Sequence, residues 1–322
     1  MWRGTSLISA AALGAIVVAA GWAQTYPVKP VRIISPYPPG GGNDTLARTI
    51  SQKLGEHLGQ QVIVDNRPGA NTIIGTELAA KSPPDGYTII LVPSSHAINQ
   101  SLYRRLPYDA IRDFSPITLA GSGPLILVVH PSLPAASVRE LIALARAKPG
   151  ELTFSSAGNG SSGHLAGVLF GLTVGVKLVH VPYKGTAPAV TDLLGGQVTM
   201  TFGTTLGVLP HVRSGKLRAL GVASLQRSPA APGIPTIAES GVPGYSASLW
   251  YGFLAPANTP KDIVQRLSAE ISRVLKLPEI RERLSNLGID PHGSAPEEFA
   301  RLIAADLEKW AKVVKESGAR ID

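Results

Sequence analysis

The sequence predicts a two-lobed α/β protein whose chain crosses twice from one lobe to the other. Its 322 residues exceed the size of one typical core. Short β-branched runs bounded by Gly and Pro alternate with helical patterns, as in buried, mostly parallel sheets. Two stretches rich in Gly or Pro, 114–124 and 224–245, interrupt this pattern and indicate the crossings. We therefore expect lobe one at 24–123 and 226–322, with lobe two inserted at 124–225.

Residues 1–23 predict a secretory signal peptide that is cleaved after export. Arg3 is the only charged side chain before Lys29, residues 7–20 are apolar, and small residues at 21 and 23 precede the cleavage point. A membrane anchor is the alternative, but the apolar run is short and no basic stop follows it. The expected location is the periplasm.

Composition excludes several classes of site. The chain has no Cys, so it has no disulfide, thiol nucleophile, zinc-thiolate site or iron-sulfur cluster. Its net charge is +8, but Lys and Arg are scattered and not interleaved with aromatic residues, so no nucleic-acid partner is expected. The positive charge fits either an ordinary solvated surface or a field that concentrates small anions.

The predicted strands and helices follow in order along the chain. Ser137 and Glu140 form a capping box that starts one helix, and Pro149-Gly150 ends it. A second helix starts at Thr259, and a long last helix starts at Ser294. Trp310 lies on the apolar stripe of the last helix, where we expect it in the core. The predicted strands are 31–35, 62–65, 88–92, 125–129, 152–155, 178–181, 198–202, 219–223 and 252–254.

A glycine-rich turn follows the first predicted strand. Pro38-Pro39-Gly40-Gly41-Gly42 leads into a helical pattern that begins near Thr45. Three glycines let the backbone turn tightly, and the positive end of the helix then faces the turn. This is the pattern of an anion-binding loop, although an ordinary strand-to-helix turn has the same glycines. It is not a nucleotide P-loop, because no Gly-Lys-Ser/Thr follows.

Lobe two has a similar turn at 156–164. The glycines at 158, 160 and 163 match the dinucleotide fingerprint in spacing, but no acidic residue lies at the end of the next strand to hold a ribose. We therefore expect no dinucleotide and no other cofactor. One such turn from each lobe, facing across a cleft, would clamp a small carboxylate through backbone N–H groups.

A Ser-dependent hydrolase is the alternative function, because Ser161, Ser162 and His164 lie close in sequence. No G-x-S-x-G elbow occurs, however, and residues so close at a helix start seldom align as nucleophile and base. The seven His show no H-E-x-x-H motif or paired spacing, so no metal site is expected.

Many short motifs in one order resemble the Bug family, the periplasmic substrate-binding receptors of tripartite tricarboxylate transporters. They span nearly the whole chain after the signal peptide. The resemblance implies a type II periplasmic-binding-protein (Venus flytrap) fold and no catalysis. It also implies a small organic carboxylate ligand and membrane permease subunits as partners. We expect a monomer, because one cleft needs no second copy to close. The motifs lie at 26–32, 38–48, 65–70, 84–88, 106–109, 157–166, 180–185, 215–220 and 255–256.

The same resemblance implies the ligand-binding residues. The carboxylate cradle, often bridged by water, corresponds to the turn after the first strand, and further contacts come from lobe two and from two cleft-lining segments. The implied residues are Tyr37, Pro39, Gly40, Gly41 and Asp44 in the cradle, Ala157, Asn159, Ser161, Ser162 and His164 in lobe two, and Ser94, Ser95, His96 and Tyr183 along the cleft.

Three further positions carry specific expectations. Many relatives resemble Met-Phe-Asp where this chain has Phe202 followed by Gly203. We therefore expect extra room at Gly203 and an unaminated mono- or dicarboxylate as ligand, with aromatic acids among the candidates. Arg67 is expected to fix a turn through Asp65 and not to bind ligand. The dipeptide at 250–251 is expected either in a hinge core or in the cleft wall.

Overall fold

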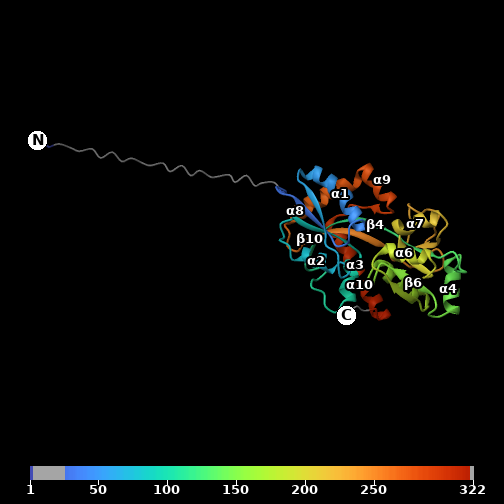
Figure 1. Cartoon of the computed structure of the whole chain (residues 1–322). Coiled ribbons are helices and arrows are strands. Elements are labelled where there is room, and N and C mark those ends of the chain that lie inside the picture. The colour runs from blue at the N-terminus through green and yellow to red at the C-terminus, as the bar shows by residue number, and fades with distance from the viewer. Residues whose placement is uncertain (3–25, 320–322) are drawn as a thin grey trace.

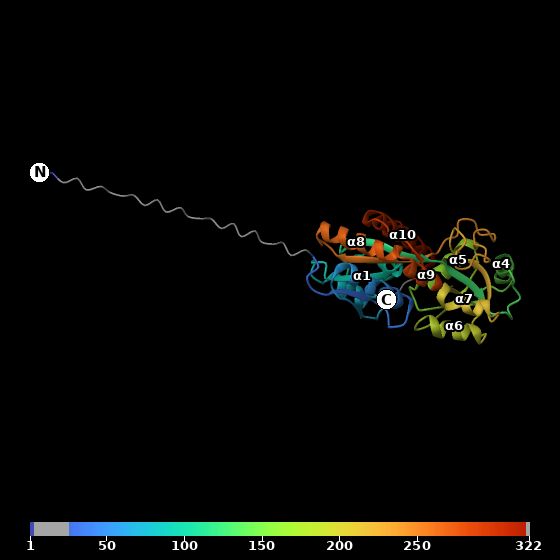
Figure 2. The same ribbon diagram turned by 90° about the horizontal axis from the view of Figure 1, so that it is seen from above.

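The computed structural model describes residues 1–2 and 26–319, so the predicted signal peptide lies almost wholly outside the described residues. Two bodies lie side by side, each with its own sheet (Figure 1). The blue and orange-to-red segments form one body and the green and yellow segments form the other, and a view from above shows the same separation (Figure 2). This is the two-lobed α/β architecture that the sequence predicts.

The first body is built on a six-stranded sheet of order β11-β4-β10-β3-β1-β2. β1 pairs in parallel with β2 and β3, whereas β10 runs antiparallel to both β3 and β4. The buried apolar runs of β1 and β3 fit a sheet covered by helices on both faces. Its strands are β1 (Val31–Ser35), β2 (Val62–Asn66), β3 (Thr88–Pro93), β4 (Phe114–Gly123), β10 (Leu249–Pro256) and β11 (Asp290–Pro291).

The helices of this body are α1 (Gly42–Leu58), α2 (Ile73–Ala80), α3 (Ser95–Leu102), α8 (Lys261–Lys276), α9 (Pro278–Asn286) and α10 (Pro296–Ser317). Trp310 of α10 is 2% exposed, which confirms its predicted place in the core. Trp250 is buried as well, packs edge-to-face on Phe299 and donates its ring N–H to Asp306. Of the two alternatives for this residue, the structure therefore selects the core.

The second body has a five-stranded sheet of order β7-β6-β8-β5-β9. Its helix α4 begins as predicted, with the Ser137 hydroxyl accepting from the Glu140 N–H. The strands are β5 (Leu125–Val129), β6 (Thr153–Ser156), β7 (Val179–Pro182), β8 (Met200–Thr204) and β9 (Arg218–Val222), and the helices are α4 (Val138–Ala147), α5 (Ser162–Val174), α6 (Thr186–Leu194) and α7 (Thr205–Arg213).

The chain enters the second sheet between β4 and β5 and returns to the first between β9 and β10. The stretch 114–124, predicted as a junction, is instead mostly strand β4. Its glycines serve close packing, because a Cβ at Gly121 would lie 2.7 Å from Ile289 Cγ2, and one at Gly123 would lie 2.7 Å from the Gly288 carbonyl oxygen. Pro124 alone separates β4 from β5.

Candidate functional site: a cleft between the two sheets

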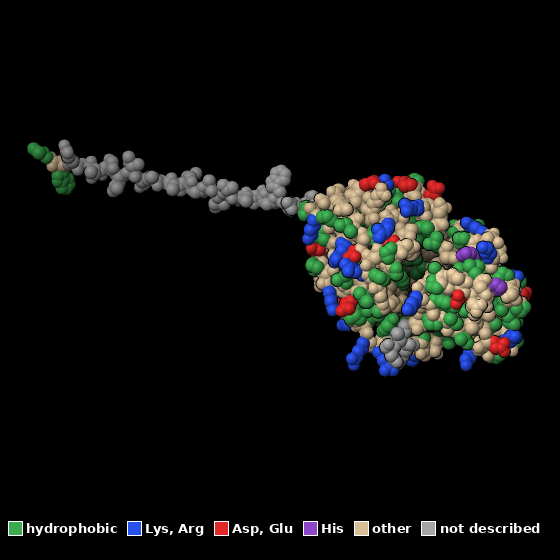
Figure 3. Space-filling view, viewed as in Figure 1, with side chains coloured by type: hydrophobic (Ala, Val, Ile, Leu, Met, Phe, Trp, Pro, Cys, Tyr) green, Lys and Arg blue, Asp and Glu red, His purple; other side chains and the backbone are tan. Residues whose placement is uncertain are grey.

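A cleft of about 730 Å³ lies between the two bodies and is lined by both. The space-filling view shows the surface hollowed there, with hydrophobic side chains at the floor (Figure 3). Pockets of this size hold small organic ligands. The lining comprises 37–43, 123–125, 156–157, 161–163, 184–191, 201–207 and 287–289, together with Pro93, Leu194, His211, Leu249 and Tyr251.

Four helices begin at this cleft. The first residues of α1, α5, α6 and α7 all belong to its lining. A helix start carries unpaired N–H groups and the positive end of the helix dipole, so each favours a negative ligand. Side chains cap two of these starts, since Ser161 accepts from the His164 N–H and Thr204 from the Gly207 N–H. No side chain caps α1 or α6, which start after Gly41 and Gly185.

The cleft is lined by a basic side chain and by no acidic one. Lys184 lines the cleft, whereas no Asp or Glu of the described residues does so. Together with the helix starts, this gives a positive site in a partly enclosed space. Such a site attracts a carboxylate and has no anionic partner for an ammonium group.

The turn before α1 is held by Asp44. Its carboxylate accepts hydrogen bonds from the Gly40 N–H at 2.9 Å, from Arg48 Nε at 3.0 Å and from Asn66 Nδ2 at 2.8 Å. Burial acts to raise the pKa of Asp44, but the bonds from Arg48, Gly40 and Asn66 outweigh it and hold the pKa below its usual value. Asp44 therefore stays ionised, and the Arg48 guanidinium balances its charge. It shapes the turn although it lies outside the lining of the cleft.

Two tyrosines stand beside this turn. Tyr37 and Tyr251 both line the cleft, and the Tyr251 hydroxyl lies 3.2 Å from where a Cβ on Gly42 would be. Burial raises the pKa of both hydroxyls, and the nearby Ser95 side chain offsets part of this rise at Tyr37. Both phenols therefore remain protonated, and both are hydrogen-bond donors at neutral pH. For Tyr251, the structure selects the cleft wall.

In the second body, a network of side chains holds the turn at 156–164. The Ser156 hydroxyl accepts from the Gly158 N–H at 3.1 Å and lies 3.0 Å from the Gly158 carbonyl oxygen and 2.7 Å from His180 Nε2. The His180 ring stacks on His164 with centroids 3.9 Å apart, and His164 Nδ1 accepts from the Gly160 N–H. Burial lowers the pKa of His164 to about 4 and, aided by His164, that of His180 to about 3. Both rings are neutral near pH 7.

These contacts argue against the hydrolase alternative. The Ser156 side chain beside His180 is only 3% exposed and contacts both the N–H and the carbonyl of Gly158, so it does not present a free nucleophile. His164 uses Nδ1 to accept from the Gly160 N–H. The Ser162 hydroxyl bonds to the Ser94 hydroxyl and not to a histidine. The neighbouring histidines therefore support the turn.

Direct contacts join the two bodies beside the cleft. The Ser94 and Ser162 hydroxyls lie 2.9 Å apart. Gly160 packs so closely on the first body that a Cβ there would lie 2.4 Å from Asn71 Nδ2 and 2.5 Å from Leu102 Cδ2. Asn71 is itself held by a 2.8 Å bond from its Nδ2 to Asn99 Oδ1.

The structure brings about half of the sequence-predicted site residues to the cleft. Those that line it are Tyr37, Pro39, Gly40, Gly41, Ala157, Ser161, Ser162 and Gly203. Those outside its lining are Asp44, Ser94, Ser95, His96, Asn159, His164 and Tyr183.

The residues outside the lining have other partners. Asp44 and His164 support the two turns, and Ser94 joins the two bodies, while Asn159 is exposed beyond the cleft. His96 is fully buried, with Nε2 donating to the Ala110 carbonyl. The Ser95 hydroxyl is buried behind Tyr37. Tyr183 donates to Asp192 Oδ2 at 2.6 Å, within its own body.

Gly203 does not provide the expected extra room. A Cβ at this position would lie 2.3 Å from Val208 Cγ1, and Val208 is fully buried in α7. The glycine is therefore needed for α7 to pack on β8, and only its backbone faces the cleft. Arg67 behaves as predicted, because its Nε bonds to Asp65 at 3.0 Å.

Sequence reasoning missed the two helices that supply much of the cleft. Helix α6 has Pro188 in its first turn and α7 has Pro210 in its interior, and proline is normally a signal against a helix. A proline in the first turn is compatible with a helix start, so the run Gly185-Thr186-Ala187-Pro188 carried a usable signal.

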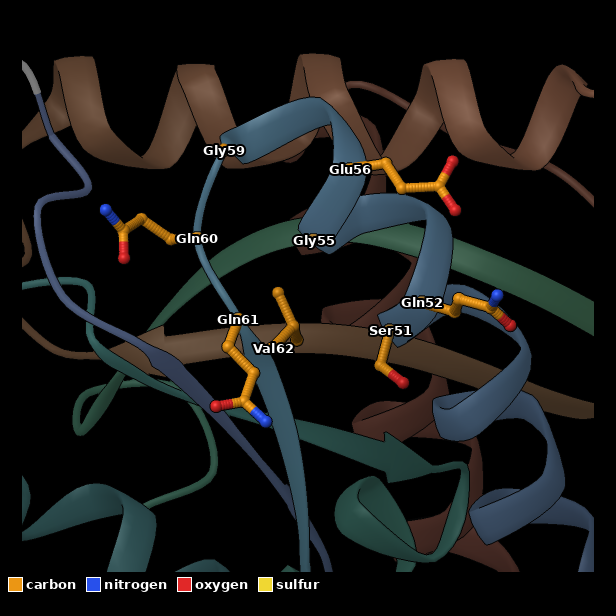
Figure 4. Close-up of a pocket in the computed structure, with 8 residues that line it drawn as sticks. All are labelled: Ser51, Gln52, Gly55, Glu56, Gly59, Gln60, Gln61 and Val62. Carbon is orange, nitrogen blue, oxygen red and sulfur yellow. The ribbon is translucent and has the colours of Figure 1, made fainter.

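A second hollow of about 480 Å³ lies on the first body, where the end of α1 meets β2 (Figure 4). It is lined by backbone and by glutamine and other surface side chains, and shares no residue with the cleft. Among the described residues, no helix is long and apolar enough to cross a membrane, and no group of three or more His, Cys, Asp or Glu is placed to hold a metal ion.

Comparison with known proteins identifies the family. Residues 46–319 match the model of the tripartite tricarboxylate transporter family receptor. Protein BugT of Bordetella pertussis is 40% identical over 318 residues, covering 97% of this chain and 98% of BugT. The structure of R. palustris Rpa4515 with adipate superposes with a TM-score of 0.84 at 38% identity, covering 91% of this chain and 98% of Rpa4515. MatC of Rhodopseudomonas palustris with bound malate gives 0.81 at 32% identity, with coverage of 90% and 100%.

The family and the fold both indicate a binding protein, and the neutral histidines of the turn at 156–164 support that turn. Relatives and structural neighbours are transporter binding proteins, so the hydrolase alternative has no support. The chain therefore belongs to the tripartite tricarboxylate transporter receptor family, as a periplasmic solute-binding receptor and not an enzyme.

Proposed function

We propose that this receptor binds a small organic carboxylate in the cleft and delivers it to the membrane permease subunits of its transporter. The observation that carries the proposal is the uncapped start of α1, which faces a cleft lined by no acidic side chain of the described residues. Structural neighbours at more than 30% identity were solved with adipate and with malate, which are both carboxylates.

The carboxylate head lies at the turn before α1. Gly41, Gly42, Tyr37 and Tyr251 line the cleft there, and their backbone N–H and hydroxyl groups would be the donors to the head. Hydrogen bonds to a charged group contribute about 1.5–3 kcal/mol each. Three or four such bonds contribute about 5–12 kcal/mol before the cost of association is subtracted. Micromolar affinity corresponds to about 8 kcal/mol and therefore also needs contacts from the second body.

The second body closes on the same ligand. Ala157, Ser161 and Ser162 line the cleft opposite the α1 turn, and the starts of α6 and α7 add further N–H groups. The two segments that cross between the sheets would act as the hinge, with lobe one at 24–123 and 226–322 and lobe two at 124–225. Ligand bridging then favours the closed form, which is the shape that the permease subunits would recognise.

Export and oligomeric state complete the proposal. Residues 1–23 would direct the chain to the periplasm and be removed there, and one cleft is enough for a monomer to bind its ligand. Light scattering of the exported protein and mass spectrometry of its amino terminus test both points.

The ligand lacks an amino group, because no Asp or Glu of the described residues lines the cleft to pair with it. Calorimetric titration of the purified protein with succinate and with aspartate tests this directly. Succinate should bind and aspartate should bind at least tenfold more weakly, since a buried unpaired ammonium loses its solvation. Tight binding of aspartate or glutamate, with none for plain dicarboxylates or benzoate, would overturn the proposal.

A further inference from the structure

We propose that the cleft contains an apolar subsite between α6 and α7 that holds the hydrocarbon body of a monocarboxylate. This inference rests on the proposed function, since the carboxylate head of the same ligand would lie at the start of α1. It adds the chemistry of the rest of the ligand, which the α1 turn does not define.

The cleft extends well beyond the point where the two bodies meet. Its lining follows α6 from Thr186 through Thr191 and reaches Leu194, while α7 lines the other side as far as His211. From Ala187 to Leu194 is seven residues, which is roughly 10 Å of helix. The cleft is therefore long enough for a head at α1 and an extended body along α6.

The walls of this extension are mainly apolar. They include Ala187, Pro188, Val190 and Leu194 from α6 and Leu206 from α7. Leu206 is 40% exposed, and a bound hydrocarbon would cover it.

Away from the starts of α6 and α7, toward Leu194, the polar groups of this extension are few and do not form a second anion cradle. Thr191 and His211 contribute side chains there, whereas Lys184 and the uncapped start of α6 lie at the opposite end of the helix from Leu194. A second carboxylate beside Leu194 would lose its hydration without a matched set of donors. Hydrocarbon loses nothing there and gains from leaving water.

Close packing at the base of the two helices gives the extension its shape. A Cβ on Gly207 would lie 2.8 Å from Thr186 Cγ2, so the helix starts touch. Val190 is 5% exposed and belongs to the core beneath them. The subsite therefore has a fixed floor, and only side chains on its rim, such as Ala187, are free to change without repacking.

The first test is a calorimetric series of straight-chain acids with the purified protein: butyrate, hexanoate and octanoate, with adipate as the dicarboxylate partner of hexanoate. Each methylene should tighten binding by about fourfold, and hexanoate should bind more tightly than adipate. Equal affinity along the series, or tighter binding of adipate than of hexanoate, would overturn the subsite while leaving the carboxylate receptor intact. Failure of every acid to bind would refute the receptor proposal itself.

The second test fills the subsite. Ala187→Leu adds a branched side chain on the exposed rim, and leucine suits a helix nearly as well as alanine. Octanoate should lose at least tenfold in affinity, whereas butyrate should stay within twofold. Ala300→Leu, on an exposed face of α10 outside the cleft lining, is the matched control and should change neither. Equal losses for both acids in Ala187→Leu, or none for octanoate, would contradict the subsite.

Discussion

Replacing Gly160 with alanine should weaken ligand binding more than it weakens the fold. Gly160 has a φ of 78°, and its new Cβ would lie 2.4 Å from Asn71 Nδ2 and 2.5 Å from Leu102 Cδ2. Neither neighbour moves freely, because Asn71 is bonded to Asn99 and Leu102 is only 1% exposed. Both neighbours belong to the first body, so opening the cleft relieves the clash.

The free-energy cost of Gly160→Ala has two parts. A left-handed alanine costs about 1–2 kcal/mol in any setting, and overpacking adds about 1–3 kcal/mol. Gly175→Ala isolates the first part, since Gly175 has a φ of 66° and no atom within 4 Å of its new Cβ. The overpacking part should appear as loss of the closed form, which corresponds to about 5- to 150-fold weaker binding.

Calorimetry with the best-binding acid measures affinity, and urea unfolding of the free protein measures stability. Gly160→Ala should unfold at nearly the same urea concentration as Gly175→Ala yet bind far more weakly. If the two variants bind equally well, the contact of Gly160 with the first body plays no part in closure. If Gly160→Ala binds as tightly as Gly175→Ala but unfolds at a lower urea concentration, the strain lowers the stability of the fold and does not open the cleft.

Three further variants test the supporting contacts. Asp44→Ala should weaken binding by about tenfold or more in calorimetry, because the Gly40 N–H loses a charged acceptor; unchanged affinity would contradict the role of Asp44 in shaping the turn. Gly203→Ala should lower the free energy of unfolding by about 1–3 kcal/mol, and adding Val208→Ala should restore part of it; no loss would show that α7 yields easily. The free energy of unfolding should decrease as the pH is lowered from about 6.5 to 4, because His164 takes up a proton there in the unfolded chain but not when buried in the folded protein. This residue alone should contribute about 1.4 kcal/mol per pH unit. His164→Gln should reduce this slope, and an unchanged slope would contradict the buried neutral ring.

The sequence predicted most of the fold because its central strands are buried on both faces. Runs such as 88–92 and 125–129 are continuous in apolar residues, and such runs are hard to place anywhere but inside a sheet. Strand β4 escaped prediction because Gly121 and Gly123 look like a linker. Their actual role, allowing β11 and the Gly288 carbonyl to approach, depends on residues more than 150 positions away.

The parts of the site formed by backbone turns could be predicted from the sequence. The parts that depend on where a side chain points could be predicted less well. The glycines around residues 40 and 158 identified both turns, since few other residues adopt their conformations. The sequence cannot say which way a side chain points, so His96 and Tyr183 were assigned to the cleft although each bonds inside its own body. For the same reason, the sequence does not distinguish a core position from a cleft position for Tyr251.

Nuclear magnetic resonance of the ¹⁵N-labelled protein during titration with the best-binding acid tests the central claim most directly. Amide signals from the α1 turn, Gly40 to Asn43, and from the α5 start, Ser161 to Gly163, should shift together with one dissociation constant. Shifts at only one of these two turns, or only at residues remote from the cleft, would contradict a carboxylate held between the two lobes.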